Sequence, residues 1–269
     1  MTDNSTAAGQ WPPAIDMTVS HSARIWNYWL GGKDHYAVDR EVGDQISRIN
    51  PDIVLTARAD RAFLRRSVRH LVAEAGIRQF LDIGTGLPTA GNTHEVAQEL
   101  APETRVVYAD NDPVVLAHAK ALLRGTPEGK TDYVDADLHD PDTILTAAER
   151  TLDFSQPIAI MLLGIVHFLN DDKEAYAIVN RLLEAVPAGS HLAIVHITAV
   201  INPAAKQEEV RHWNEHGTPK LTIRTPEQIG RFFDGLEILP PGIVSTTRWR
   251  PDIDDAPEVD GFCGVGRKP

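Results

Sequence analysis

The sequence has few of the features of secreted or membrane-spanning proteins. It contains one cysteine, Cys263, in 269 residues, so no disulfide can form within the chain, which fits a reducing compartment. The longest apolar run, Pro157 to Leu169, is shorter than the roughly 20 residues that a membrane-spanning helix needs. Residues 1–13 are small and polar and lack the apolar core of a signal peptide. We therefore expect a soluble, cytoplasmic protein with no membrane partner.

Basic side chains are also scarce relative to acidic ones. Lys and Arg number 26 against 38 Asp and Glu, which gives a formal net charge of −12. Such a charge repels phosphate backbones, so we expect no nucleic-acid partner. One basic stripe, at helical spacing, is interpreted as a solvated face and, as an alternative, as an anion-binding or partner surface: Arg58, Arg61, Arg65 and Arg69.

The pattern of residues divides the chain into three segments. Residues 1–20 are predicted to be a flexible leader, because they are small and polar and show no periodicity. Residues 21–75 have the 3.6-residue periodicity of helices and predict an N-terminal helical cap. Residues 76–269 alternate short β-rich runs with helical stretches, which predicts one Rossmann-like domain.

The alternation in the third segment predicts an α/β fold. We expect strands at Arg78–Ile83, Arg105–Ala109, Thr131–Val134, Ile158–Leu162 and His191–Ile197. Several of these runs are continuously apolar, as expected when helices cover both faces of a parallel sheet. The order therefore implies a doubly wound, mostly parallel sheet with right-handed crossovers. Two late runs, Leu236–Val244 and Gly261–Gly266, could pair as an antiparallel edge at the C-terminal end.

The residues that follow each predicted strand matter most, because ligands of such sheets bind outside the carboxyl ends of the strands. After the first strand, Gly84 and Gly86 allow backbone to approach a ligand closely. After the second, Asp110 can accept hydrogen bonds from both hydroxyls of a ribose. After the third, Asp137 can accept one from an adenine amino group, with Leu138 near the ring. Each signal alone could be an ordinary turn, whereas the three together favour a cofactor that contains a nucleoside.

These motifs resemble those of the class I S-adenosylmethionine-dependent methyltransferases. More narrowly, the chain is similar to a bacterial family of S-adenosyl methyltransferases that was formerly a domain of unknown function. The matching segments are Ser22–Asp34, Phe80–Thr89, Val107–Leu116 and Gly264–Pro269. The resemblance implies a Rossmann-like, doubly wound sheet of seven strands and S-adenosylmethionine as the methyl donor. It implies no particular acceptor.

The resemblance also implies which residues bind the donor. Four of them surround its methionine moiety: Asp82, Gly84, Thr85 and Gly86. Two follow the fourth strand and line the methyl end: Leu163 and Gly164. The nucleoside positions are Asp110 on the ribose, Asn111 beside Asp110 and flanking the adenine face, and Asp137 on the adenine.

The N-terminal segment resembles the lid of this family, which would fold over the donor. The lid positions are Arg24, Tyr28, Gly31 and Lys33. Helical periodicity is consistent with this role, because Arg24 and Tyr28 share the face opposite Trp26 and Trp29. One face could then pack while the other meets the ligand. In the alternative interpretation, Arg24 and Lys33 only pair with surface carboxylates.

Methyl transfer chiefly requires an acceptor lone pair held in line with the methyl group. A base helps when the acceptor is a hydroxyl or a protonated amine. His167, after the fourth predicted strand, and His196, at the end of the fifth, are the candidate catalytic bases, although each could be a structural histidine. Tyr36, His35 and Trp249 are further candidates for contact with the acceptor.

A competing motif runs from His212 to His216. It matches the His-x-x-Glu-His pattern of inverted zinc peptidases. However, Gly217-Thr-Pro219 interrupts the helix at once, and no third ligand follows at a suitable spacing. We therefore predict no metal site and expect this helix to help cover the acceptor pocket.

Taken together, the sequence predicts an S-adenosylmethionine-dependent methyltransferase. It would transfer a methyl group by direct displacement to an unidentified small-molecule acceptor, through oxygen or nitrogen. The alternatives are a non-catalytic S-adenosylmethionine-binding module and a nicotinamide-dependent oxidoreductase, which shares the first two strand-tip features but has no need of the third. The oligomeric state is left open.

Overall fold

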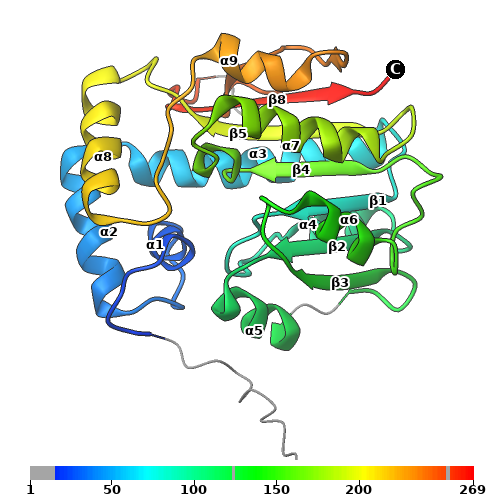
Figure 1. The fold of residues 1–269 in the computed structure, drawn as a ribbon, viewed down its shortest axis with the longest axis horizontal. Coiled ribbons are helices and arrows are strands. Elements are labelled where there is room, and N and C mark those ends of the chain that lie inside the picture. The colour runs from blue at the N-terminus through cyan, green and yellow to red at the C-terminus, as the bar shows by residue number, and fades with distance from the viewer. Residues whose placement is uncertain (1–15, 123–124, 253–254) are drawn as a thin grey trace, which may run out of the picture.

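The computed structural model describes residues 16–122, 125–252 and 255–269 (Figure 1). Within these residues one sheet of eight strands has the order β3-β2-β1-β4-β5-β8-β6, with β7 paired to β8. The five parallel strands are β1 (Gln79–Ile83), β2 (Arg105–Asp110), β3 (Lys130–Asp135), β4 (Ala159–Leu163) and β5 (His191–Ile197). The antiparallel strands are β6 (Glu237–Ile238), β7 (Val244–Ser245) and β8 (Gly261–Arg267).

This sheet confirms the predicted fold class, since a mostly parallel, doubly wound sheet carries an antiparallel C-terminal edge. The late run at Leu236–Val244 differs from its prediction. It contains Pro240-Pro241, and proline has no N–H to donate to a strand ladder. The run is therefore divided into β6 and β7, which both pair with β8. This division explains why the described residues form eight strands instead of seven.

Helices cover both faces of the sheet. On one face, α3 (Ile53–Ala73) and α4 (Thr93–Leu100) pack against strand residues such as Phe80 and Met161. On the other face, α6 (Pro141–Ala148), α7 (Asp172–Glu184) and the 3-10 turn η2 (Arg231–Phe233) pack against Leu81 and Ile160. Successive residues of β1 and β4 enter opposite layers because side chains alternate along a strand. The remaining elements of this part are α5 (Pro113–Leu122), η1 (Val166–Phe168) and α9 (Pro226–Gly230).

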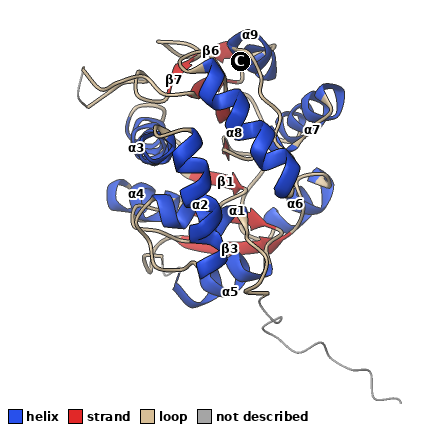
Figure 2. Ribbon diagram, turned by 90° about the vertical axis from the view of Figure 1, so that its left-hand side faces the viewer, coloured by secondary structure: helices blue, strands red, loops and turns tan. Residues whose placement is uncertain are grey.

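A helical cap lies at the carboxyl ends of the parallel strands (Figures 1 and 2). It consists of α1 (Ser22–Trp29), α2 (Ala37–Ile49) and α8 (Pro203–His216), which meet around buried apolar side chains of α1, α2, α8 and the start of α3. The helix α3 begins in this cluster and continues into the core of the sheet. The domain boundary at residue 75 therefore stays a prediction. No helix of the described ranges is both long and apolar enough for a membrane span.

A buried ion pair joins the first two helices of the cap. Arg24 Nε lies 2.9 Å from Asp39 Oδ2, and both side chains are almost inaccessible to solvent. The Asp39 carboxylate also accepts hydrogen bonds from the backbone N–H groups of His21 and Tyr36. One carboxylate thus fixes the start of α1 and the start of α2 at the same point, which satisfies backbone donors that a helix leaves free.

Candidate functional site

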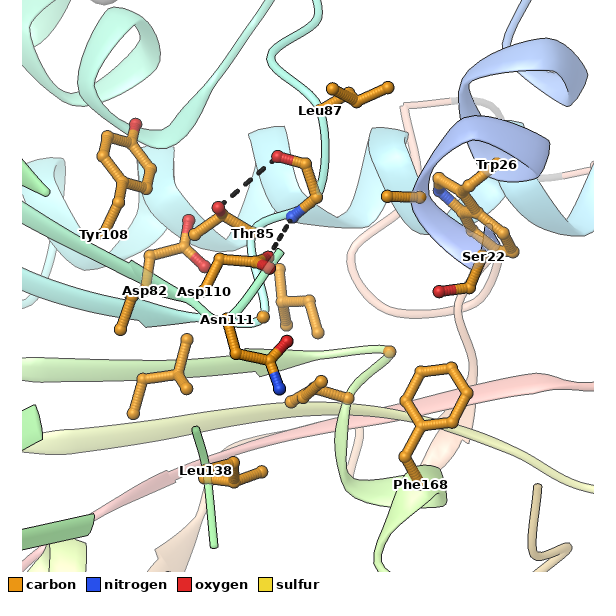
Figure 3. Close-up of a pocket in the computed structure, with 18 of the residues that line it drawn as sticks. Ser22, Trp26, Asp82, Thr85, Leu87, Tyr108, Asp110, Asn111, Leu138 and Phe168 are labelled. Carbon is orange, nitrogen blue, oxygen red and sulfur yellow. Dashed lines mark hydrogen bonds between the residues drawn. The ribbon is translucent and has the colours of Figure 1, made fainter. Parts of the chain in front are cut away.

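A cavity of about 490 Å³ lies between the strand tips and α1, a size typical of small-molecule sites. Figure 3 shows Asp82, Thr85 and Asp110 on one side of it and Trp26 of α1 on the other. Its wall continues from the tips of β2 and β3 to η1 after β4, to α3, and to Thr218 and Pro219 after α8. The residues before η1 in this wall include Leu163 and Gly164.

The turn after β1 is shaped by its glycines. Gly84 has a φ of +74°, and a Cβ at this position would lie 2.6 Å from the side chain of Ile165. Gly86 also has a positive φ, of +62°, a conformation that other residues rarely adopt. The Gly86 N–H donates a hydrogen bond to Asp110 Oδ2 at 2.9 Å (Figure 3). The turn is therefore tied to the end of β2, and its backbone lines the cavity.

Asp110 is held in place by backbone donors on both of its oxygens. Besides Gly86, the N–H of Asp112 donates to Asp110 Oδ1 at 2.9 Å. Burial raises the pKa of Asp110, although these two N–H groups act in the opposite direction. A carboxylate offers about four acceptor positions, so two remain for a ligand in the cavity.

The tips of β2 and β3 are joined through Asp137. Asn111 Nδ2 donates to Asp137 Oδ2 at 2.7 Å, and the His139 N–H donates to Asp137 Oδ1 at 2.8 Å. Partial burial would raise the pKa of Asp137, but these donors and the His139 ring outweigh it and lower the pKa. Leu138 packs beside them in the cavity wall. The structure thus brings together the strand-tip residues that the sequence predicted for a nucleoside.

Asp82 and Arg61 form a second polar region at the tip of β1. Asp82 is buried and accepts a hydrogen bond from the Thr93 hydroxyl at 2.6 Å. Burial raises the pKa of Asp82 to about 6, against the lowering effect of Thr93 and Arg61. Arg61 Nη2 donates to the Thr89 carbonyl at 3.1 Å and to Asn92 Oδ1 at 2.8 Å, while its buried Nε has no hydrogen-bond partner in the described structure.

Arg61 departs from its sequence interpretation as part of a solvated stripe. The other three arginines of the stripe are exposed, whereas Arg61 lines the cavity. The reason is the position of α3, which passes the strand tips with one side toward the cavity. Thr85 completes this region, with its Oγ1 2.6 Å from the hydroxyl of Tyr133.

The structure does not bring the four predicted lid residues to the cavity. Arg24 pairs with Asp39 inside the cap. The alternative interpretation paired Arg24 with a surface carboxylate, whereas the carboxylate of Asp39 is buried. The Tyr28 hydroxyl donates to Asp44 at 2.7 Å. Gly31, with a φ of +80°, follows the end of α1 and is exposed, and Lys33 is exposed as well.

The opposite face of α1 lines the cavity instead. Its contributions are Ser22, Ala23, Trp26, Asn27 and Leu30. The helix has this orientation because Ile25 and Trp29 pack in the cap cluster, while the charge of its arginine is neutralised within the cap. In this structure the cavity is thus lined by a different face of α1 from the one that carries the predicted lid residues.

A polar contact closes the cap onto the sheet. His21, the N-cap residue of α1, has its Nδ1 2.9 Å from Asp112 Oδ2. Asp112 Oδ1 accepts a hydrogen bond from the N–H of Val114 at 2.8 Å at the start of α5. The contact joins the beginning of the cap to the segment that holds Asp110.

Of the two candidate bases, His167 lines the cavity. Its Nδ1 is buried and has no hydrogen-bond partner among the residues that the structure describes. Burial lowers the pKa of His167 well below 6.5, and His196, Lys206 and Arg224 lower it further. The ring is therefore neutral at physiological pH and keeps one nitrogen with a free lone pair.

His196 has a structural environment. It is fully buried and does not line the cavity. Its Nδ1 lies 2.8 Å from the Ile197 carbonyl, and its Nε2 lies 2.9 Å from Nη1 of Arg224. Burial lowers its pKa to about 3. Both ring nitrogens are therefore engaged within the protein, which favours the structural alternative for His196.

The three further acceptor candidates also lie outside the cavity wall. Trp249 is fully buried, with its ring centroid 5.3 Å from that of Phe63. The Tyr36 ring lies beneath the Arg24 guanidinium, at 5.2 Å. His35 Nε2 lies 3.1 Å from the Gly32 carbonyl. All three stabilise the surrounding helices.

The histidines of the zinc-like motif lie close together on α8. The rings of His212 and His216 are 4.6 Å apart. No third ligand joins them, because the described part of the chain contains no group of three side chains suited to a metal ion. The loop that follows α8 reaches the cavity through Thr218 and Pro219.

Comparison with known proteins identifies the family. The model of the S-adenosyl methyltransferase family matches residues 8–269. The chain belongs to this family. A DUF574 family protein from Streptomyces avermitilis MA-4680 is 46% identical, with a TM-score of 0.92 over 95% of this chain and 100% of the other. A putative methyltransferase from Thermobifida fusca YX is 40% identical, with a TM-score of 0.88 over 97% and 99% of the two chains. No curated protein matches the chain.

Membership of the S-adenosyl methyltransferase family makes the protein a methyltransferase with S-adenosylmethionine as its donor. This membership excludes the alternative of a nicotinamide-dependent oxidoreductase. The cavity fits this donor. Gly84 and Gly86 allow the backbone to approach a ligand closely, and Asp110 and Asp137 offer hydrogen-bond acceptors at adjacent strand tips. The buried Nε of Arg61 is a donor that lacks a partner in the described structure.

Proposed function

We propose that the enzyme transfers the methyl group by direct displacement to a small-molecule acceptor, through oxygen or nitrogen. When bound, S-adenosylmethionine supplies an electrophilic methyl group on a sulfonium. The observation that carries the proposal is the extent of the cavity. It continues from the tips of β2 and β3 past β4 to His167, Phe168 and Leu169, beyond the positions assigned to the donor.

The donor would be held by residues of the four strand tips. We assign to it Asp82, Gly84, Thr85, Gly86, Asp110, Asn111, Asp137, Leu138, Leu163 and Gly164. The hydrogen bonds within this group orient the carboxylates before a ligand arrives, which lowers the ordering cost of binding. Arg24, Tyr28, Gly31 and Lys33 maintain the cap in this proposal and do not contact the donor.

The acceptor would lie on the β4 side of the cavity, between the cap and η1. Trp26 of α1 and Phe168 of η1 supply aromatic surface there (Figure 3), and α1 keeps water from the reacting atoms. We propose that His167 orients the acceptor by accepting a hydrogen bond from its hydroxyl or amine. A group held in this way can contribute about 10²–10⁴-fold to the rate when it also takes the proton.

A turnover assay across a panel of small hydroxyl and amine compounds tests this function. S-adenosylhomocysteine formation is measured beside calorimetry with S-adenosylmethionine. We expect donor binding and turnover with a subset of acceptors, and His167→Gln is expected to lower turnover without changing the donor Kd. Donor binding without turnover on any compound would instead support a non-catalytic binding module.

A further inference from the structure

One carboxylate in the cavity wall has no cationic partner among the described residues. Asp60 lines the cavity from α3, and its Oδ1 is buried without a hydrogen bond in the described structure. Asp60 also takes part in no ion pair among the residues described. Gly261 of β8 provides the space for it, because a Cβ at that position would lie 2.6 Å from Asp60 Oδ1. The fold therefore accommodates a buried carboxyl group that no cationic side chain pairs with.

The charged groups around Asp60 are engaged elsewhere. Lys206 of α8, which is fully buried, lies 2.8 Å from Glu209 Oε2. Burial raises the pKa of Asp60 to about 7, whereas hydrogen bonding by the Thr246 side chain and, to a lesser extent, the charge of Lys206 lower it. On β8, burial and the Asp60 charge raise the pKa of the Cys263 thiol well above its usual range, so this neighbour is uncharged.

Asp60 lies apart from the nucleoside end of the cavity. It lies against Gly261 of β8, which is beyond β4 and β5 in the sheet order, whereas the nucleoside positions follow β2 and β3 at the other end of that order. The cavity wall also includes His167, Trp26 and Phe168. The Lys206 charge lowers the pKa of both Asp60 and His167, so these two side chains lie near the same residue. This part of the wall combines a carboxylate without a cationic partner, a neutral imidazole and aromatic surface.

We infer that Asp60 binds a cationic amine, and that the acceptor of this methyltransferase is a primary or secondary amine with an aromatic or other apolar substituent. This inference rests on the proposed function. An ammonium group would supply the cationic partner that the Asp60 carboxylate lacks, since buried charges are normally paired. Aromatic faces also attract cations, and the neutral His167 ring adds no opposing charge.

The same carboxylate can prepare the nitrogen for transfer. The ammonium gives one proton to Asp60, whose neutral form burial favours, and the nitrogen gains a lone pair. That lone pair forms a bond to the methyl carbon as the methyl–sulfur bond breaks, and the electron pair of the broken bond stays on sulfur. Positive charge thereby moves from sulfur to nitrogen, and Asp60 later returns its proton to solvent.

Binding of a matched amine and alcohol to the full-length protein tests the inference without turnover. The probes are 2-phenylethylamine and 2-phenylethanol, titrated by calorimetry into protein saturated with S-adenosylhomocysteine. The wild type should bind the amine at least about tenfold more tightly, because charged hydrogen bonds contribute more than neutral ones. Asp60→Asn should remove this preference. Asp142→Asn, which removes one charge from an exposed ion pair with Arg181, should retain it.

A wild-type measurement covers the case in which Asp60→Asn fails to fold. At pH 7, a carboxyl group with a pKa of about 7 is half protonated, so amine binding should release about half a proton, measured in buffers of different ionisation enthalpy. The inference is overturned if amine and alcohol bind equally, if neither binds, if no proton is released, or if Asp60→Asn keeps the preference. Failure of S-adenosylhomocysteine to bind the wild type would count against the proposed function instead.

Discussion

Replacement of Asp110 by alanine tests the donor assignment most directly. In the structure this carboxylate accepts N–H hydrogen bonds from Gly86 and Asp112, both at 2.9 Å, and faces the cavity. Asp110→Ala would remove the acceptors proposed for the ribose hydroxyls. It would also release Gly86, which shapes the turn after β1.

The expected size of the effect follows from the number of bonds lost. A hydrogen bond to a charged group contributes about 1.5–3 kcal/mol, and about 1.4 kcal/mol corresponds to a tenfold change in Kd. The loss of one effective bond to the donor therefore weakens binding about 10- to 100-fold. The loss of both hydroxyl contacts would exceed this range.

Calorimetry with S-adenosylmethionine measures the change, and Asp135→Ala is the matched control. Asp135 of β3 is the registered neighbour of Asp110, is exposed, and does not line the cavity. Asp135→Ala removes the same charge from the neighbouring strand. The reasoning is refuted if Asp110→Ala binds within twofold of the wild type, or if Asp135→Ala loses as much affinity.

Three further predictions concern stability, and urea denaturation measures the first two. A left-handed conformation costs a residue with a Cβ about 1–2 kcal/mol, and Gly84→Ala should lower the free energy of unfolding by more than this because the new Cβ also meets Ile165. Gly86→Ala should lower it only by the conformational cost, because no atom lies within 4 Å of the new Cβ. Equal losses for the two variants would contradict this account. The folded state raises the pKa of Asp60 from its ordinary 3.8 to about 7. The contribution of Asp60 to stability is therefore complete below pH 4, and about 4 kcal/mol of the free energy of unfolding is lost as pH rises to 7. Asp60→Asn should lack this loss, and parallel pH profiles of the variant and the wild type would disprove it. Asp39→Ala leaves the buried Arg24 without its carboxylate and should lower the free energy of unfolding by about 3–5 kcal/mol. The rate of amide hydrogen exchange should then rise first in α1 and α2. A uniform rise across the sheet would argue against a local role of this ion pair.

The strand tips were predictable from the sequence because a parallel sheet orders them. Once the apolar runs are recognised as parallel strands, Gly84, Asp110 and Asp137 must meet at one edge. The structure shows them in one cavity wall. Their chemistry could be interpreted because each follows directly after a strand.

The cap was only half predictable. Helical periodicity separates the two faces of α1 but does not reveal which face meets which neighbour. The orientation is decided by Asp39, which neutralises Arg24 from the next helix, so that Trp26 lines the cavity. A pattern within one helix carries no information about such a partner.

Asp60 escaped the sequence analysis for a related reason. It lies in the middle of a helix whose neighbouring arginines dominate the pattern, and its burial depends on Gly261 in the last strand. Arg61 was missed in the same way. Functional residues that reach a site from the side of a helix leave no strand-tip signal.

The contact between His21 and Asp112 has a kinetic consequence. It joins the start of α1, which lines the cavity, to the segment that carries Asp110, so α1 cannot move away from the sheet without separating these two side chains. We expect the residence times of the donor and of the product to depend on the contact between His21 and Asp112 as well as on their own contacts with the cavity. Removal of the His21 ring would then accelerate release and exchange, even though His21 need not touch the transferred methyl group.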